Sequence, residues 1–263
     1  MDKFRALWRH TAVRRVVYLC VIVLLWQALY MSGRFPEIMF PSAGEILTTL
    51  ADEILDGSLI VKTGYSLYLI GVGMLLSLVL AVLLTILAML VKTVRDVIGM
   101  LISILDPLPG IALLPLAILW IGIGEESIIF VMIHSVLWPI LLNVIAGFDS
   151  VPVIYQEVGR SFGMPRLKLI ARVYVPAAFP SILTGIKTGW ARAWRALISA
   201  EMVFGATGTT GGLGWDIYTK RSYLDMPGMF ASLLVIMAIG ILVEEMLFKV
   251  IERKTLRKWG MVR

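Results

Sequence analysis

Cysteine and charged residues are both scarce in this 263-residue chain, and each scarcity excludes a class of protein. The single cysteine, Cys20, cannot form an intrachain disulfide or a thiolate metal cluster, which excludes a small disulfide-stapled fold. Charged residues make up 16% of the chain and hydrophobic residues 59%, whereas soluble proteins have roughly a quarter and a half. We therefore predict an all-α polytopic membrane protein that is surrounded by the lipid bilayer.

Two sequence patterns are also missing. The chain has no G-x-x-x-x-G-K-[ST] phosphate-binding loop, so it is not expected to hydrolyse ATP by itself. It shows no internal repeat, which gives no support to the inverted-repeat architecture of many secondary carriers. The net charge of +6 would suggest nucleic acid in a soluble protein, but in a membrane protein basic cytoplasmic loops explain it, and we expect no nucleic-acid partner.

Six apolar runs are each long enough, or nearly so, to cross a hydrocarbon core, which takes about 20 helical residues. The expected spans are residues 16–31, 65–91, 97–121, 128–148, 180–204 and 229–250. We expect a break within the third span at Asp106–Gly110 (DPLPG), because proline removes helical hydrogen bonds. Between the first two spans, residues 41–56 predict a short amphipathic outer helix with Ser42 as its N-cap.

The connections between the spans differ in length and charge. We expect a cytoplasmic turn at 92–96, an outer turn at 122–127, a long basic loop at 149–179 and a Gly/Thr-rich outer loop at 205–228. This reading divides the chain into an N-terminal part (1–63), a core of five spans (64–250) and a basic tail (251–263). Seventeen of the 24 Lys and Arg residues then lie on the cytoplasmic side and four outside, which places both termini in the cytoplasm.

The loop at 149–179 contains a spaced pattern. Glu157 is followed six residues later by Gly163, and after nine more residues by Val173-Tyr-Val-Pro176. The pattern resembles the "EAA" loop of the inner-membrane permease subunits of bacterial ABC importers, with Val158 and Gly159 in place of two alanines and valines in place of Ile and Leu. The loop also lies between the fourth and fifth of six spans, where that family has it.

Three further stretches are similar to the branch of that family that imports nitrate, aliphatic sulfonates and taurine. They are FPSAGEI at 40–46, LDPLPGIALLPLAILWIGIGEESII at 105–129 and SAEMVFG at 199–205. The resemblance implies a type I ABC importer permease fold in the bacterial inner membrane. It also implies a homodimer, two ABC ATPase subunits that bind ATP and Mg, an extracytoplasmic substrate-binding protein and no cofactor in this chain.

The resemblance implies a role for the loop as well. It would form a coupling helix lodged in a cleft of the ATPase, with Glu157, Gly163 and Pro176 as matched motif positions. We add Arg160 and Arg166 as expected ATPase contacts because the loop is basic.

Arg192 and Arg195 stand deep within the fifth span, three residues apart and so on one helix face. Cations there are costly and usually face a cavity, a partner or the bundle interior. One hypothesis is that they attract an anionic or zwitterionic solute. The alternative is that they pair with Glu201, with Asp106 or with backbone carbonyls.

Four other residues are candidates for the substrate path. Trp194 and Glu201 share the fifth span, although Trp194 would more often be a packing or lipid-facing residue. His134 is more often a packed, hydrogen-bonded histidine than a ligand contact. Asp106 could satisfy the broken backbone or gate the path, and the sequence favours neither.

Two other functions compete with the importer. An ion-coupled carrier acting alone would need mid-membrane carboxylates, for which Asp106 and Glu201 are a thin basis. An intramembrane serine protease around His134 and Ser135 lacks a nucleophile motif, and adjacent helical residues do not face each other.

Overall fold

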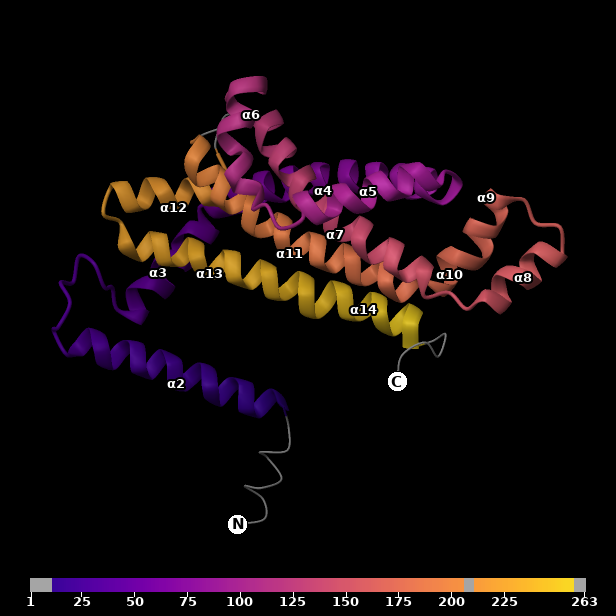
Figure 1. Ribbon diagram of the computed structural model, residues 1–263. Coiled ribbons are helices and arrows are strands. Elements are labelled where there is room, and N and C mark those ends of the chain that lie inside the picture. The colour runs from indigo at the N-terminus through magenta and orange to yellow at the C-terminus, as the bar shows by residue number, and fades with distance from the viewer. Residues whose placement is uncertain (1–10, 206–210, 258–263) are drawn as a thin grey trace, which may run out of the picture. The chain divides into compact units, whose positions relative to one another are not determined.

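The computed structural model describes residues 11–205 and 211–257, and every regular element in this part of the chain is a helix (Figure 1). The prediction of an all-α fold is therefore confirmed. The first ten residues of the predicted basic N-terminus, residues 206–210 of the predicted outer loop and residues 258–263 of the tail lie outside the described residues.

Between residues 11 and 149 the chain forms six α-helices. They are α2 (Thr11–Met31), α3 (Ala43–Leu55), α4 (Ser58–Leu90), α5 (Lys92–Leu105), α6 (Leu114–Ile121), which follows a 3-10 turn at Gly110–Leu113, and α7 (Glu125–Asp149). Ser42 caps α3 as predicted, and Glu45 completes a capping box by accepting the Ser42 backbone N–H.

The second half contains the loop helices and two long helices. The elements are α8 (Val153–Ser161), α9 (Arg166–Leu169), a π-helical turn (Ile170–Tyr174), α10 (Val175–Ala177), α11 (Phe179–Phe204), α12 (Leu213–Ser222), α13 (Met226–Leu242), a second π-helical segment (Val243–Phe248), α14 (Lys249–Glu252) and a third π-helical turn (Arg253–Arg257).

Four helical stretches of the described chain are each long and apolar enough to cross a membrane: Val13–Met31, Ser58–Leu90, Glu125–Asp149 and Met226–Leu256. Two bent pairs would bring the total to six. Lys92–Leu105 meets Gly110–Ile121 at 93°, and Arg166–Ala177 meets Phe179–Phe204 at 74°. The bent pairs contain the predicted third and fifth spans.

Two local expectations were wrong. The predicted cytoplasmic turn at 92–96 is the first turn of α5, and Val91 alone separates α4 from α5. The predicted outer loop contains the ten-residue helix α12, whose Asp216 and Lys220 form an i,i+4 ion pair. Gly211 and Gly212 precede α12 and Gly214 lies in its first turn, so these glycines do not prevent the helix that follows.

The chain forms two compact units. The first comprises Met1–Ile60 with Asp216–Val235. Within it a buried ion-pair cluster joins α3, α12 and α13: the Lys220 Nζ lies 2.5 Å from Glu53 Oε2 and 2.8 Å from Asp216 Oδ2, and it donates to Ser232 Oγ at 3.0 Å. Buried charges are tolerated when paired and hydrogen-bonded in this way.

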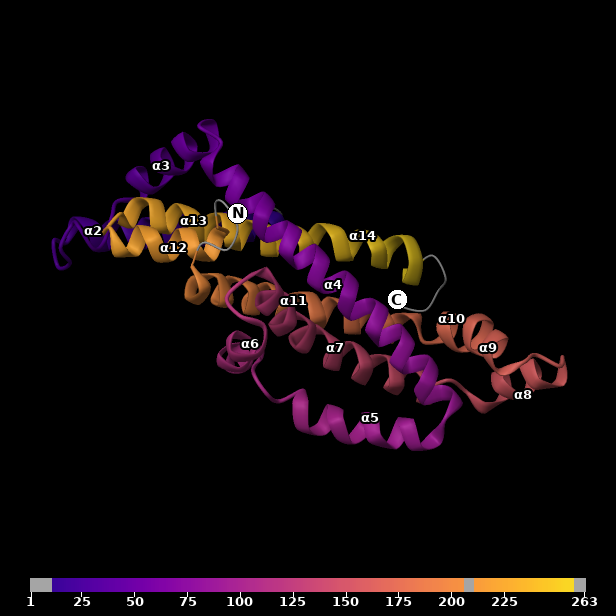
Figure 2. The same cartoon turned by 90° about the horizontal axis from the view of Figure 1, so that it is seen from above.

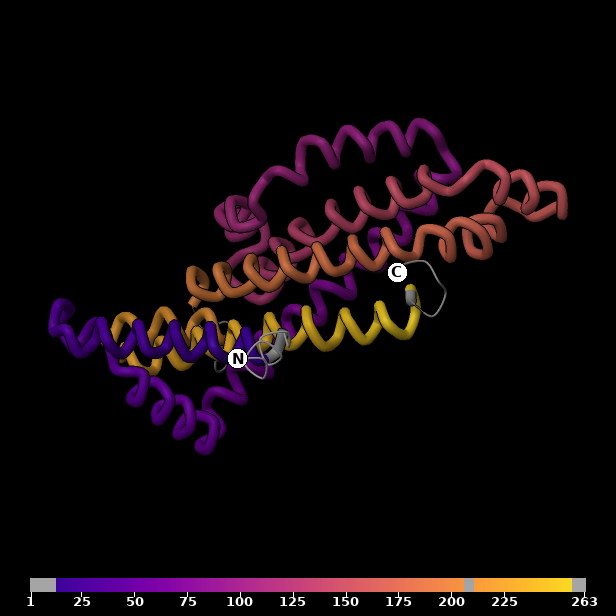
Figure 3. Tube along the Cα trace, turned by 90° about the horizontal axis from the view of Figure 1, so that it is seen from below, coloured from indigo at the N-terminus to yellow at the C-terminus, as the bar shows by residue number. Residues whose placement is uncertain are grey.

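The second unit comprises Val61–Trp215 with Ile236–Arg263 and contains α7 and α11, which run side by side (Figures 1, 2 and 3). Small residues allow the two backbones to approach closely. A Cβ atom on Gly185 of α11 would lie 3.2 Å from the Ile140 Cα of α7, and one on Gly147 of α7 would lie 2.6 Å from the Ser181 Cβ. The α7–α11 pair is therefore the closely packed centre of this unit, and the loop helices extend from it (Figure 1).

Candidate functional site

The break between α5 and α6 shapes the centre of the second unit. Proline at 107 and 109 cannot donate hydrogen bonds, so α5 ends at Leu105 and the chain turns. Gly110 lies tightly against α7: a Cβ atom there would overlap the Ser135 Oγ and lie 3.1 Å from the Val131 carbonyl oxygen. The broken segment is thus pressed onto α7, and Asp106 stands at the point where the helix ends.

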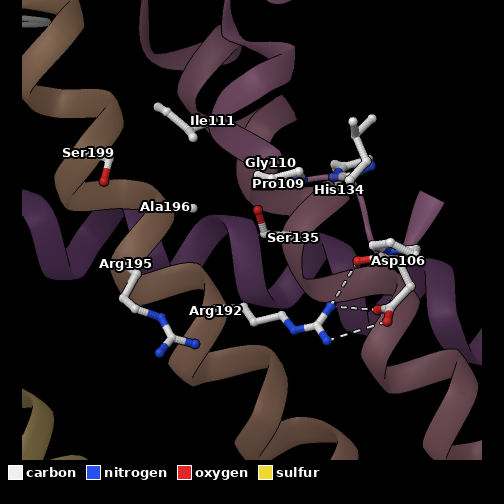
Figure 4. A pocket seen from close by; sticks show the side chains of 12 residues that line it. Asp106, Pro109, Gly110, Ile111, His134, Ser135, Arg192, Arg195, Ala196 and Ser199 are labelled. Atoms are coloured by element: carbon white, nitrogen blue, oxygen red, sulfur yellow. Dashed lines mark hydrogen bonds and ion pairs between the residues drawn. The ribbon is translucent and has the colours of Figure 1, made fainter.

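Asp106 forms an ion pair with Arg192 of α11 (Figure 4). The Arg192 Nη1 donates to Asp106 Oδ1 at 2.5 Å and to the Asp106 carbonyl oxygen at 3.3 Å, while Nη2 lies 3.4 Å from Oδ2. The guanidinium group therefore satisfies a carboxylate and a carbonyl freed by the broken helix. The structure thus shows Arg192 paired with Asp106, which is one of the pairings that the sequence left open.

A cavity of about 580 Å³ lies beside this pair. It is lined by residues of the broken segment, α7 and α11: Asp106, Pro107, Leu108, Pro109, Gly110, Ile111, His134, Ser135, Arg192, Arg195, Ala196 and Ser199. The spacing argument that placed Arg192 and Arg195 on one face agrees with this lining. Their role in binding a solute remains a prediction.

Arg195 and His134 line the cavity but take no part in the Asp106–Arg192 ion pair. The Arg195 guanidinium is turned away from the Asp106–Arg192 pair (Figure 4), and among the described residues no ion pair of Arg195 is found. Both ring nitrogens of His134 are buried without a hydrogen-bond partner in the described part of the chain. The expectation that His134 is hydrogen-bonded is therefore wrong, whereas the ring does pack edge-to-face against Trp138, with centroids 6.2 Å apart.

Trp194 and Glu201 do not line this cavity. Trp194 is 7% exposed and stacks on Trp190, with ring centroids 6.0 Å apart and the ring planes 9° apart. Helical geometry explains this, because two residues along α11 correspond to a rotation of about 200° away from Arg192. Trp194 is a packing residue in this structure.

Glu201 fastens the chain that enters α12. Its side chain accepts hydrogen bonds from the Ser66 Oγ at 2.7 Å and from the Gly214 N–H at 2.8 Å. The Leu213 N–H in turn donates to Ser66 Oγ at 3.0 Å. Glu201 is 1% exposed, so these bonds provide the compensation that a buried carboxyl group requires. Pairing of Glu201 with Arg192 or Arg195, one of the predicted alternatives, does not occur.

The loop between α7 and α11 forms a second candidate site. Helix α8 ends in a Schellman motif: the Gly163 N–H donates to the Arg160 carbonyl at 2.8 Å, and the Met164 N–H donates to the Gly159 carbonyl at 3.1 Å. Gly163 has a φ of +67°, a left-handed conformation that disfavours other residues. The glycine of the sequence pattern is thus required by the turn that reverses α8 onto α9.

Helix α8 exposes apolar side chains. Ile154, Tyr155, Val158 and Phe162 are 58%, 56%, 47% and 78% exposed, and Glu157 beside them is exposed as well. We call these four apolar residues the α8 apolar face. Sequence reasoning missed this face because it weighed the basic residues of the loop, although the apolar residues at positions 154, 155, 158 and 162 follow helical spacing.

The other predicted coupling residues lie elsewhere on the loop. Arg160 and Arg166 line a second cavity beneath it, and the Arg166 Nη1 donates to the Leu90 carbonyl at the end of α4. Pro176 is exposed and lies in α10, just after the π-helical turn. A π-helical turn two residues before a proline accommodates the missing N–H and is frequent at functional sites. Their contact with an ATPase remains a prediction.

Comparison with known proteins gives a consistent result. The family described as the inner membrane component of binding-protein-dependent transport systems matches residues 73–257. A Bacillus subtilis protein provisionally named as an aliphatic sulfonates transport permease is 30% identical over 91% of this chain and 84% of its own length. The taurine transport system permease protein of Escherichia coli is 27% identical over 91% of this chain and 89% of its length. The nitrate import permease protein of a Synechocystis strain is 30% identical, covering 79% and 78% of the two chains.

Proposed function

Because the chain belongs to the family of inner-membrane components of binding-protein-dependent transport systems, we propose that it forms the membrane path of an ABC importer for a small anionic or zwitterionic solute. In this proposal two separate ATPase subunits, which bind ATP and Mg²⁺, drive the path through the loop at 149–179. An extracytoplasmic binding protein delivers the solute, and a second copy of this chain completes the path in the inner membrane, with both termini and the loop in the cytoplasm.

The charge balance of the cavity supports the class of solute. Asp106 neutralises Arg192, so Arg195 contributes one uncompensated positive charge per chain. A guanidinium group binds a sulfonate, carboxylate or nitrate oxygen pair through two parallel N–H groups. Ser199, one helical turn from Arg195, adds a hydroxyl group to the lining of the same cavity. The names of the relatives, which refer to sulfonates, taurine and nitrate, support the same class.

The α8 apolar face is the observation that carries the coupling mechanism. The loop helices extend past the ends of α7 and α11 (Figure 1), so lipid surrounding those spans would not cover this face. An apolar patch of this kind on a water-facing loop marks a protein contact. The chain runs directly from this face through α9 and α10 into α11, which carries Arg192 and Arg195.

This continuity suggests how the solute path would respond to ATP. Closure of the two ATPases would displace α8 together with α9, since Gly159 of α8 packs so closely on Leu169 that a Cβ atom there would overlap it. The 74° bend at Ala178 then transmits the displacement to α11. Nucleotide and solute would each shift the population between two arrangements of the bundle, according to their differential affinity for each.

The proposal is tested by purifying the complex through a tag on this chain. Val158→Asp and Phe162→Asp each place a carboxylate on the α8 apolar face and should abolish recovery of the ATPase subunit. Lys168→Asp, at an exposed position of α9 in the same loop, is the control and should retain it. Equal recovery of the ATPase with all three variants would contradict the proposed docking face.

A further inference from the structure

A second cavity, of about 520 Å³, lies between the loop and the junction of α4 with α5. Its walls come from the last turn of α4, the first turn of α5 and the loop from α8 to the π-helical turn. The lining residues are Ala88, Met89, Leu90, Lys92, Arg95, Arg160, Met164, Arg166, Leu169, Ile170 and Tyr174. We call this space the basic cavity.

The lining of the basic cavity contains four cations and no carboxylate. Arg95 is paired with Asp149, which does not line the cavity. Arg166 donates to the Leu90 carbonyl at 3.4 Å, which leaves its charge uncompensated. Within residues 11–205 and 211–257, no acidic partner of Lys92 or Arg160 is found. The cavity therefore holds a surplus of positive charge that an anionic ligand would neutralise.

The inner wall of the basic cavity is apolar. Leu169, Ile170 and Tyr174 are 6%, 8% and 8% exposed and form this wall together with Ala88. Next to the cavity, Leu87 and Val91 expose 47% and 46% of their surface at the end of a 33-residue apolar helix. A site that combines clustered cations with lipid-facing apolar surface at the end of a span matches a molecule with a phosphate head and acyl chains.

We propose that the basic cavity binds the phosphate head group of an anionic phospholipid, with the acyl chains lying along the exposed end of α4. A free phosphate ion would use the cations but not the apolar surface of α4, so the phospholipid accounts for both features. The head group would connect Arg160 of the loop with Lys92 of the α4–α5 junction. Without an anion between them, these two positive charges repel each other. The bound lipid would therefore hold the loop against the bundle.

The binding itself does not depend on the proposed transport function. Only its consequence for coupling rests on that proposal, because the loop would be the element that the ATPase moves. Occupation of the basic cavity would use Arg160 and Arg166 for lipid, and the α8 apolar face, on the outside of the same loop, would remain for the ATPase.

The test measures lipid binding to the purified permease, with no ATPase present, by native mass spectrometry and by titration with a fluorescent phosphatidylglycerol. The variant is Lys92→Gln with Arg160→Gln. The matched control is Lys168→Gln with Arg172→Gln, which removes the same charge from exposed positions that do not line the cavity. Each basic residue near an anionic surface contributes a factor of about five to binding, so the first pair should weaken binding about 25-fold and the control pair less than about 2-fold.

Further measurements distinguish a bound phospholipid from a free phosphate ion, and they test whether a loss of binding comes from misfolding. Phosphatidylcholine should not bind measurably, and 10 mM (about a thousandfold excess over lipid) inorganic phosphate should not displace the phosphatidylglycerol. Lys92→Arg, which keeps the charge, should bind as the parent protein does. Equal losses in the two double variants, or displacement by inorganic phosphate, would overturn the proposal. It would also be overturned if Lys92→Gln with Arg160→Gln bound phosphatidylglycerol as tightly as the parent protein does.

Discussion

The Asp106–Arg192 pair allows a quantitative test of the site. The Asp106 and Arg192 side chains retain 18% and 36% of their exposure, so the pair is partly buried. A hydrogen bond to a charged group contributes about 1.5–3 kcal/mol when buried, and exposed pairs contribute about 1 kcal/mol or less. Because the guanidinium is more than a third exposed, we expect a coupling energy of about 1–2 kcal/mol.

The two single substitutions should differ. Arg192→Gln leaves the more buried carboxylate of Asp106 without its partner and should lower the free energy of unfolding by about 2–3 kcal/mol. Asp106→Asn leaves a guanidinium that still reaches solvent and the Asp106 carbonyl, so we expect a loss of about 1 kcal/mol. The double variant should be less destabilised than the sum of the two.

The assay is equilibrium unfolding of the purified permease in mixed micelles for the parent, both single variants and the double variant. Losses that add within about 0.3 kcal/mol would refute the pairing as an energetic link between the broken segment and α11. A larger loss of unfolding free energy for Asp106→Asn than for Arg192→Gln would refute the assignment of Asp106 as the more buried partner of the pair.

Three further predictions follow from other parts of the structure. Arg195→Gln should raise the solute concentration for half-maximal uptake about 10-fold, because it removes a charge–charge interaction with the solute that exposure has already weakened. The variant complex should assemble normally. The control Lys187→Gln, on the same helix but paired with Glu244, should change uptake little. Gly163→Ala should lower stability by about 1–2 kcal/mol because of its φ of +67°, whereas Gly99→Ala, in open space within α5, should have no such cost in the same unfolding assay. Lys220→Met removes the cation that pairs with Glu53 and Asp216 and should destabilise α3, α12 and α13 by about 3–5 kcal/mol, seen as faster hydrogen exchange in those helices. Unchanged exchange would contradict the ion-pair cluster.

The membrane-spanning helices were predictable because their apolar runs approach or exceed the length that a bilayer requires. The break after Leu105 was also predictable, since two prolines within three residues cannot continue a helix. The Glu157–Gly163–Pro176 spacing located the loop. The structure adds the physical reason for the glycine, which is the left-handed turn of the Schellman motif.

The partners of the charged residues were less predictable. Asp106 lies 86 residues from Arg192 in the chain, and only the folded backbone shows that they meet. That Glu201 does not pair with Arg192 could have been foreseen from the sequence. Nine residues along a helix correspond to about two and a half turns, so Glu201 lies on the face opposite Arg192. The burial of Asp216 and Lys220 could not have been foreseen from the sequence, because it depends on α3 and α13 packing around α12.

The central claim is that ATP hydrolysis by separate subunits drives solute through this chain by way of the α8 apolar face. The most direct measurement is uptake of labelled solute into vesicles that contain the permease, its ATPase and its binding protein. We expect uptake with ATP, none with a non-hydrolysable analogue, and none in the Val158→Asp variant. Uptake by the permease alone under an ion gradient, or undiminished ATP-driven uptake in Val158→Asp, would contradict the account.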